Sequence, residues 1–253
     1  MFFPLRDYRP SRTFPWVTVT IIAIDVLIYL YQALILGDQR VLVRVGLHSA
    51  YLTKEDLFIY TYGLSPCEVL GSCSPFPPAE FPLWATLFTS MFLHGSLLHV
   101  AGNMWYLWVF GDNVEDAMGK VRFLTFYLLS GLAAGLAQIL VNPDTQTPMV
   151  GASGAISGVL GAYLILYPRG RVLTLLWVFY FVRFIRLPAL YFLGFWFLFQ
   201  LLSASLVGTG EGGGIAWMAH IGGFVAGMLL VRLFVPQPRS RSRPRLGPPD
   251  LPV

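Results

Sequence analysis

Residues 151–167 of this chain have the sequence GASGAISGVLGAYLILY. The stretch is apolar or small throughout, which favours a membrane-spanning helix over approximately residues 152–167. Gly154, Gly158 and Gly161 recur three to four residues apart, so they share one face of that helix. A face of glycines lets a second helix approach closely. We therefore expect this helix to pack tightly against another helix of the same protein.

The composition of the whole chain indicates the same environment. Hydrophobic residues make up 56% of the 253 residues and charged residues only 12%, whereas soluble domains contain roughly 45–50% and about 25%. So few charges could not cover the apolar surface of a soluble fold, which makes lipid the expected solvent. The basic residues behind the net charge of +4 lie between apolar segments and at the ends, which argues against nucleic-acid binding.

The apolar segments predict an all-α fold, a polytopic membrane bundle of six transmembrane helices within residues 16–235. Residues 1–15 would form a cytoplasmic segment, residues 37–83 a large outer loop, and residues 236–253 a disordered basic cytoplasmic tail. The expected spans are approximately residues 16–36, 95–110, 121–141, 152–167, 188–207 and 215–234.

The distribution of basic residues predicts the orientation of the bundle. With the N-terminus in the cytoplasm, 14 of the 17 Lys and Arg residues lie on the cytoplasmic side and 3 lie outside. The apolar segment Val172–Leu187 contains Arg183 and Arg186, and counting it as a seventh span would break this bias. We therefore predict that this segment is a shallow helix at the cytoplasmic surface.

Two polar residues at the outer ends of spans are candidates for catalysis, because polar groups inside a membrane are costly. Ser153 begins the fourth span, and His220 lies a few residues into the sixth, on a face of small residues. A lone serine is more often a packing residue, and Ala155 breaks the Gly-x-Ser-x-Gly elbow of soluble hydrolases. However, both spans run from outside to inside, so Ser153 and His220 enter at similar depths. A Ser–His contact at that depth would activate the serine.

Other polar residues of the spans are compatible with more than one role. His99 and Asn103 are four residues apart on one face of the second span. They suit hydrogen bonding to an oxyanion, or alternatively form an interhelical polar clasp. Asp25, in the middle of the first span, is expected to make a buried hydrogen bond to a neighbouring helix. The remaining polar residues of the spans are also functional candidates for the same reason, although the sequence assigns them no specific role. They are Gln138, Ser157 and Gln200.

Several segments together resemble the rhomboid family. Residues 92–104, FLHGSLLHVAGNM, are similar to the rhomboid second-helix signature of two histidines followed by asparagine. Residues 151–154, GASG, resemble the family's Gly-x-Ser-Gly nucleophile motif. Ala219-His220 with its following glycines resembles the sixth-helix motif, and residues 110–116, FGDNVED, resemble the turn after the second helix. The Trp-Arg pair that many rhomboids carry before the second helix is missing, because Ala85 follows Trp84.

The resemblance implies an intramembrane serine endopeptidase that lies in the lipid bilayer and cleaves transmembrane protein substrates near the outer face of the membrane. Ser153 would be the nucleophile and His220 the general base, while His99, Asn103 and the Ser153 backbone N–H would form the oxyanion hole. No Asp or Glu lies in the fourth or sixth span to complete a triad, and no cofactor or metal is implied. By the same analogy, the compact core suggests a bacterial inner membrane, and the glycine-rich loop 208–214 would be a mobile cap.

Several alternatives remain beside this interpretation. An inactive rhomboid-like protein that binds client transmembrane helices would be expected to lack the serine or the histidine. A small transporter would be expected to show internal repeats, and a metalloprotease needs a His-Glu-x-x-His motif, but the sequence contains neither. Cys67 and Cys73 both lie in the outer loop, where a disulfide and two free thiols are both compatible with the sequence.

Overall fold

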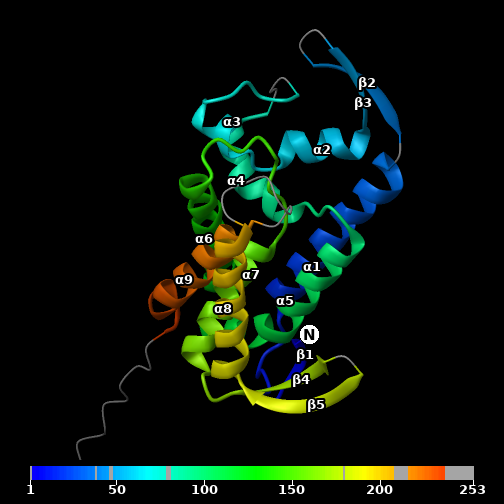
Figure 1. The fold of residues 1–253 in the computed structure, drawn as a ribbon. Helices are drawn as coiled ribbons and strands as arrows, with labels where there is room; N and C mark the ends of the chain where they lie inside the picture. The colour runs from blue at the N-terminus through cyan, green and yellow to red at the C-terminus, as the bar shows by residue number, and fades with distance from the viewer. Residues whose placement is uncertain are drawn as a thin grey trace, which may run out of the picture.

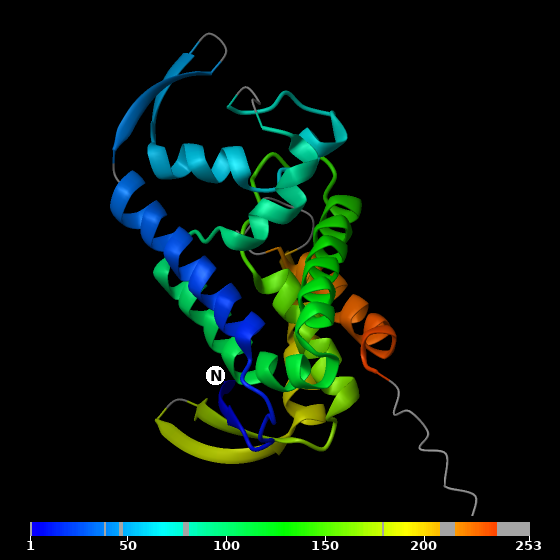
Figure 2. The same ribbon diagram turned by 180° about the vertical axis from the view of Figure 1, so that it is seen from behind.

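The computed structural model describes residues 2–37, 39–45, 48–77, 81–178, 180–207 and 216–236. Most of these residues are helical, and the long helices form a bundle with a small β-sheet at each end (Figures 1 and 2). We call the end that carries β1 (Phe2–Asp7) the base of the bundle. The opposite end, which carries β2 (Arg40–Val45) and β3 (His48–Thr53), is the top.

The helices of the bundle agree with the six predicted apolar segments. α7 lies at the centre and is buried from Gly154 to Tyr163. The bundle helices are α1 (Trp16–Leu30), continued by η1 (Tyr31–Leu36), α5 (Leu97–Met118), α6 (Lys120–Val141), α7 (Ser153–Leu166), α8 (Ala189–Val207) and α9 (Trp217–Phe234).

Length and composition identify the helices that can cross a membrane. Four segments of the described chain qualify on their own: Trp16–Leu36, Lys120–Val141, Ala189–Leu206 and Trp217–Phe234. A fifth candidate is the pair Leu83–Phe92 and Leu97–Met118, whose two parts are bent by 79°. α7 is apolar but has only 14 residues. The protein is therefore a membrane protein with four or five long apolar helices, to which α7 adds a shorter one.

The tightest helix contact joins α7 to α9, as the glycine pattern predicted. A Cβ atom added to Gly223 would collide with the carbonyl oxygen of Gly154, and one added to Gly227 would collide with that of Gly158. A Cβ atom on Gly161 would likewise meet the carbonyl oxygen of Phe224. The two backbones are therefore in direct contact, which only residues without side chains allow.

The prediction of a shallow helix over residues 172–187 is wrong, and the fold is not purely helical. β4 (Arg171–Val178) and β5 (Phe181–Pro188) form an antiparallel hairpin, and β1 pairs with β4 to complete a sheet in the order β1-β4-β5. The segment is rich in β-branched and aromatic residues, which suit a strand. Its partner β1 is more than 160 residues away in sequence, inside the segment 1–15 for which the sequence predicted no strand.

The N-terminal segment is held against α5 by buried hydrogen bonds. The Glu115 carboxylate accepts hydrogen bonds from the backbone N–H groups of Val17 and Thr18, at 3.0 and 2.8 Å, and thereby caps α1. Asp7 accepts hydrogen bonds from Asn113 and Tyr163, at 2.8 and 2.9 Å. These contacts explain why residues 110–116 continue α5 to Met118 instead of forming the expected turn.

The top of the bundle is built from residues 37–93, most of which were expected to form a loop. Besides the β2–β3 hairpin it contains α2 (Lys54–Tyr62), α3 (Pro66–Leu70), η2 (Leu83–Ala85), α4 (Thr86–Thr89) and η3 (Ser90–Phe92).

A disulfide joins Cys67 to Cys73, which settles the alternative left open by the sequence. The side chain of Gln32 bonds both the N–H and the carbonyl of His94, and so holds the bend before α5.

The expectation for Asp25 is not met. Its side chain is completely buried, yet neither carboxylate oxygen has a hydrogen-bond partner among the described residues. The hydroxyl group of Tyr127, in α6, is also buried without such a partner.

The α7–α9 contact leads to a test by glycine substitution. Gly227→Ala would press a methyl group against the Gly158 backbone and force the helices apart. We expect a loss of about 1–3 kcal/mol in stability, measured as a lower melting temperature in detergent. The control is Gly194→Ala in α8, where an added Cβ meets no atom within 4 Å. Equal melting temperatures for the two variants would contradict the role of this contact.

Candidate active site

Ser153 is the first residue of α7, and a glycine with a positive φ lies two residues before it. Gly151 has a φ of +121°, a conformation that residues with side chains rarely adopt. Its N–H donates to the carbonyl oxygen of Ser90 at 2.9 Å, which holds the approach to the helix in place. Because Ser153 starts the helix, its backbone N–H has no partner within α7 and is available to another acceptor.

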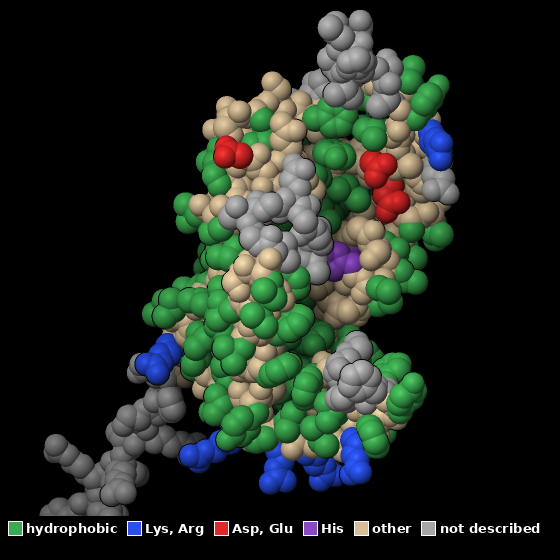
Figure 3. Space-filling view, viewed as in Figure 1, with side chains coloured by type: hydrophobic (Ala, Val, Ile, Leu, Met, Phe, Trp, Pro, Cys, Tyr) green, Lys and Arg blue, Asp and Glu red, His purple; other side chains and the backbone are tan. Residues whose placement is uncertain are grey.

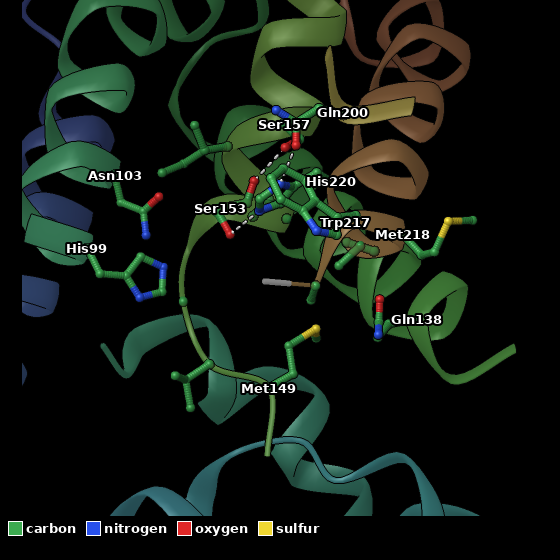
Figure 4. A pocket seen from close by; sticks show the side chains of 18 of the residues that line it. His99, Asn103, Gln138, Met149, Ser153, Ser157, Gln200, Trp217, Met218 and His220 are labelled. Carbon is green, nitrogen blue, oxygen red and sulfur yellow. Dashed lines mark hydrogen bonds between the residues drawn. The ribbon is translucent and has the colours of Figure 1, made fainter. Parts of the chain in front are cut away.

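The structure brings Ser153 and His220 together. The Ser153 hydroxyl oxygen lies 2.8 Å from Nε2 of His220, although the two residues are 67 positions apart in the sequence (Figure 4). His220 lies in the first turn of α9, and Ser153 begins α7. The glycine contact between these helices therefore sets the Ser–His distance.

The third member of this cluster is Gln200 of α8, a residue to which the sequence assigned no role. Its Oε1 atom lies 2.8 Å from Nδ1 of His220, and the side chain is buried. A carbonyl oxygen can only accept a hydrogen bond, so Nδ1 carries the proton and Nε2 is free to accept one from Ser153. The sequence signal that could have pointed to Gln200 is its position as a polar amide in the middle of a largely apolar helix.

Two tryptophan rings flank His220. The ring centroids of Trp196, in α8, and Trp217, in α9, each lie 6.2 Å from that of the imidazole. These rings restrict the rotation of the histidine, while Gln200 and Ser153 occupy its two nitrogen atoms. The imidazole is therefore held in one orientation from several sides.

His99 and Asn103 extend from α5 towards the segment just before Ser153 (Figure 4). A Cβ atom on Gly151 would lie 2.7 Å from the His99 ring and 3.5 Å from Nδ2 of Asn103. The Asn103 amide nitrogen is buried without a hydrogen-bond partner in the described part of the chain. No side-chain hydrogen bond of His99 or Asn103 to another described residue is formed, so the interhelical bond of a polar clasp is not observed.

These residues line one cavity of about 1030 Å³. It also reaches Gln138 and Asn142 at the end of α6, and Figure 3 shows a histidine side chain at a hollow in the molecular surface. The predicted cap, residues 208–214, lies outside the described residues. Within the described ranges, no group of three His, Cys, Asp or Glu side chains is arranged to hold a metal ion.

A comparison with known families agrees with the geometry. The family model described as "Rhomboid domain" matches residues 82–237, which include every residue of the cluster. This chain belongs to the rhomboid family.

Several curated proteins are similar to this rhomboid-family chain. RHOMBOID-like protein 1 of Arabidopsis thaliana is 28% identical over 94% of this chain and 60% of its own length. Rhomboid protease GluP of Bacillus subtilis is 42% identical over 32% of this chain and 15% of its own. The mouse presenilin-associated rhomboid-like protein, mitochondrial, is 35% identical over 38% of this chain and 26% of its own. The chain thus spans less than two thirds of the length of these relatives.

The contact between Gln200 and His220 can be tested by removing its acceptor. Gln200→Met keeps the length of the side chain but leaves Nδ1 of His220 without a partner. We expect the turnover number kcat to fall about tenfold, which corresponds to one hydrogen bond, with little change in KM or melting temperature. Gln200→Glu, which keeps an acceptor oxygen, is the control and should retain more activity than Gln200→Met. Equal kcat values for Gln200→Met and the unsubstituted protein would rule out a positioning role.

Proposed function

We propose that this rhomboid-family protein is an intramembrane serine endopeptidase that cleaves transmembrane substrate proteins with a Ser153–His220 dyad. The observation that carries the proposal is the 2.8 Å contact between the Ser153 hydroxyl and Nε2 of His220. Supporting it is the acceptor at Nδ1, because Gln200 favours the tautomer that a general base requires. For the alternative, an inactive protein that binds client helices, the described residues offer no contact that supports it as directly.

The proposed reaction follows the chemistry of other serine hydrolases. His220 takes the hydroxyl proton through Nε2 as the Ser153 oxygen attacks the carbonyl carbon of the substrate. The resulting oxyanion accepts hydrogen bonds from Nδ2 of Asn103, from the His99 ring and from the Ser153 backbone N–H. His220 then passes the proton to the leaving amine, and a water molecule activated in the same way hydrolyses the acyl-enzyme.

We count α7 as a span in addition to the five long candidates, which gives six spans with both ends of the chain in the cytoplasm. A helix of 14 residues is about 21 Å long, which is shorter than a hydrocarbon core of about 30 Å. The non-helical backbone before α7 borders the cavity, and such backbone is tolerated at membrane depth where it lines a water-filled space. Water would reach Ser153 through this cavity, and cleavage would occur near the outer face.

The proposed location is a bacterial inner membrane, and its support is the compact core alone. The name of the mouse relative refers instead to the mitochondrion. The substrate class implied by the family is a transmembrane helix with small or helix-breaking residues near the cleavage site.

The dyad is tested by removing each of its members. In purified form, Ser153→Ala and His220→Ala should each abolish cleavage of a model transmembrane substrate while melting temperatures stay within a few degrees of the parent. A fluorophosphonate probe should label the parent protein and not Ser153→Ala. Ser157→Ala is the matched control, since the Ser157 hydroxyl donates to the Ser153 carbonyl at 2.6 Å and the ring nitrogens of His220 bond Gln200 and Ser153 instead. Full cleavage by Ser153→Ala would refute the proposal.

The oxyanion hole predicts a specific effect for Asn103. Loss of one donor of this kind costs about 10²–10³ in turnover, so Asn103→Ala should lower kcat by that factor with a smaller change in KM. Ser153 should still react with the fluorophosphonate, though more slowly. If Asn103 serves only to join helices, Asn103→Ala would instead lower the melting temperature and leave the turnover per active site unchanged.

A further inference from the structure

The β4–β5 hairpin presents large apolar side chains that are more than half exposed. We call the exposed residues of its distal half the aromatic tip, and their exposed fractions range from 53% to 98%. The aromatic tip consists of Trp177, Tyr180, Phe181, Val182 and Phe184. In both views of the ribbon the hairpin projects sideways from the base of the bundle (Figures 1 and 2). The aromatic tip is therefore exposed to the solvent or lipid around the protein and is not packed under its helices.

The same hairpin carries three arginines. Arg171, Arg183 and Arg186 are exposed, and Lys and Arg side chains gather along the lower edge of the molecule, over this hairpin (Figure 3). The Arg186 guanidinium lies 4.7 Å from the centre of the Tyr8 ring, a contact that leaves its N–H groups free to bind an anion. No acidic side chain of the described residues forms an ion pair with these arginines. Their charge is therefore available to an anionic partner.

The backbone of the hairpin limits the depth at which it can lie. In the strand order β1-β4-β5, β5 is an edge strand, and one row of its backbone N–H and carbonyl groups is unpaired within the sheet. Such an edge is too costly in hydrocarbon but can bind water or headgroups. Aromatic residues beside arginines are typical of the membrane–water interface.

We propose that the β4–β5 hairpin is an interfacial anchor. The aromatic tip inserts into the boundary of the leaflet at the base of the bundle, and Arg183 and Arg186 bind the phosphate groups of anionic phospholipids. Two observations favour lipid over a soluble protein as the partner of this surface. The arginines complement the charge of anionic headgroups, and the tip continues the apolar surface of the spanning helices. The proposal rests on the membrane insertion of the bundle and is independent of the proposed proteolysis.

The depth of the aromatic tip is measured with a spin label in the full chain, reconstituted in nanodiscs. Cys67 and Cys73 form a disulfide, so Phe184→Cys introduces a single reactive thiol. Leu129→Cys on the lipid-facing side of α6 and Ser72→Cys in the top loop are the controls for hydrocarbon and water. We expect the label at residue 184 to be less accessible to a water-soluble nickel chelate, and more accessible to oxygen, than the label at residue 72. Nickel accessibility equal to that of the Ser72→Cys label would overturn the proposal, since the tip would then be free for a soluble partner.

The lipid preference is measured by native mass spectrometry with phosphatidylglycerol and phosphatidylcholine as probes. We expect the protein to retain phosphatidylglycerol preferentially, and Arg183→Gln and Arg186→Gln each to weaken its binding about fivefold, since one arginine near an anionic surface contributes ~1 kcal/mol. The control is Arg40→Gln together with Lys54→Gln at the top, which should leave binding unchanged. Excess inorganic phosphate should not displace the lipid. Equal retention of the two lipids, or retention insensitive to the hairpin substitutions at an unchanged melting temperature, would overturn the proposal.

Discussion

The direct backbone contact between α7 and α9 is the constraint on which the rest of the structure depends. Hydrophobic burial cannot bring helices together in lipid, where tails are as apolar as the side chains, so close packing of small residues takes its place. Gly223 and Gly227 lie against the carbonyl oxygens of Gly154 and Gly158. Since the two helices cannot slide without collision, their first turns keep a fixed relative height. That height determines the distance between the hydroxyl and the imidazole at the top of the pair.

The chemistry of the cluster is consistent with its apolar surroundings. A carboxylate beside His220, as the third member of the cluster, would be a buried charge, and its desolvation would cost several kcal/mol. The amide of Gln200 offers a hydrogen-bond acceptor without that charge. The imidazole is thus oriented by a neutral partner and by aromatic rings. Three helices, α7, α8 and α9, contribute to the contacts of His220 with Ser153 and Gln200, and α5 places His99 and Asn103 beside the same cavity.

The two ends of the bundle have different construction. At the top, the segment before α7 borders the cavity together with the helices, and a disulfide closes a short loop. At the base, buried hydrogen bonds to Glu115 and Asp7 join the N-terminal segment to the helices, and the sheet extends outward as the hairpin. The cluster that includes Ser153 thus lies away from the surface on which the hairpin would meet lipid headgroups. Reaction and anchoring would accordingly use separate parts of the fold.

The sequence by itself determined the features that depend on local pattern. Apolar length predicted the helices, glycine spacing predicted the face by which α7 packs, and the motifs around Ser153, His220 and Asn103 indicated the family. Tertiary structure alone decided the features that join distant segments. The hairpin at residues 172–187 is joined by β1 into a three-stranded sheet, and no local periodicity records a partner so far away. Gln200 acts on His220 only because α8 turns its amide towards α9, and a polar residue in an apolar helix does not reveal which neighbour it faces.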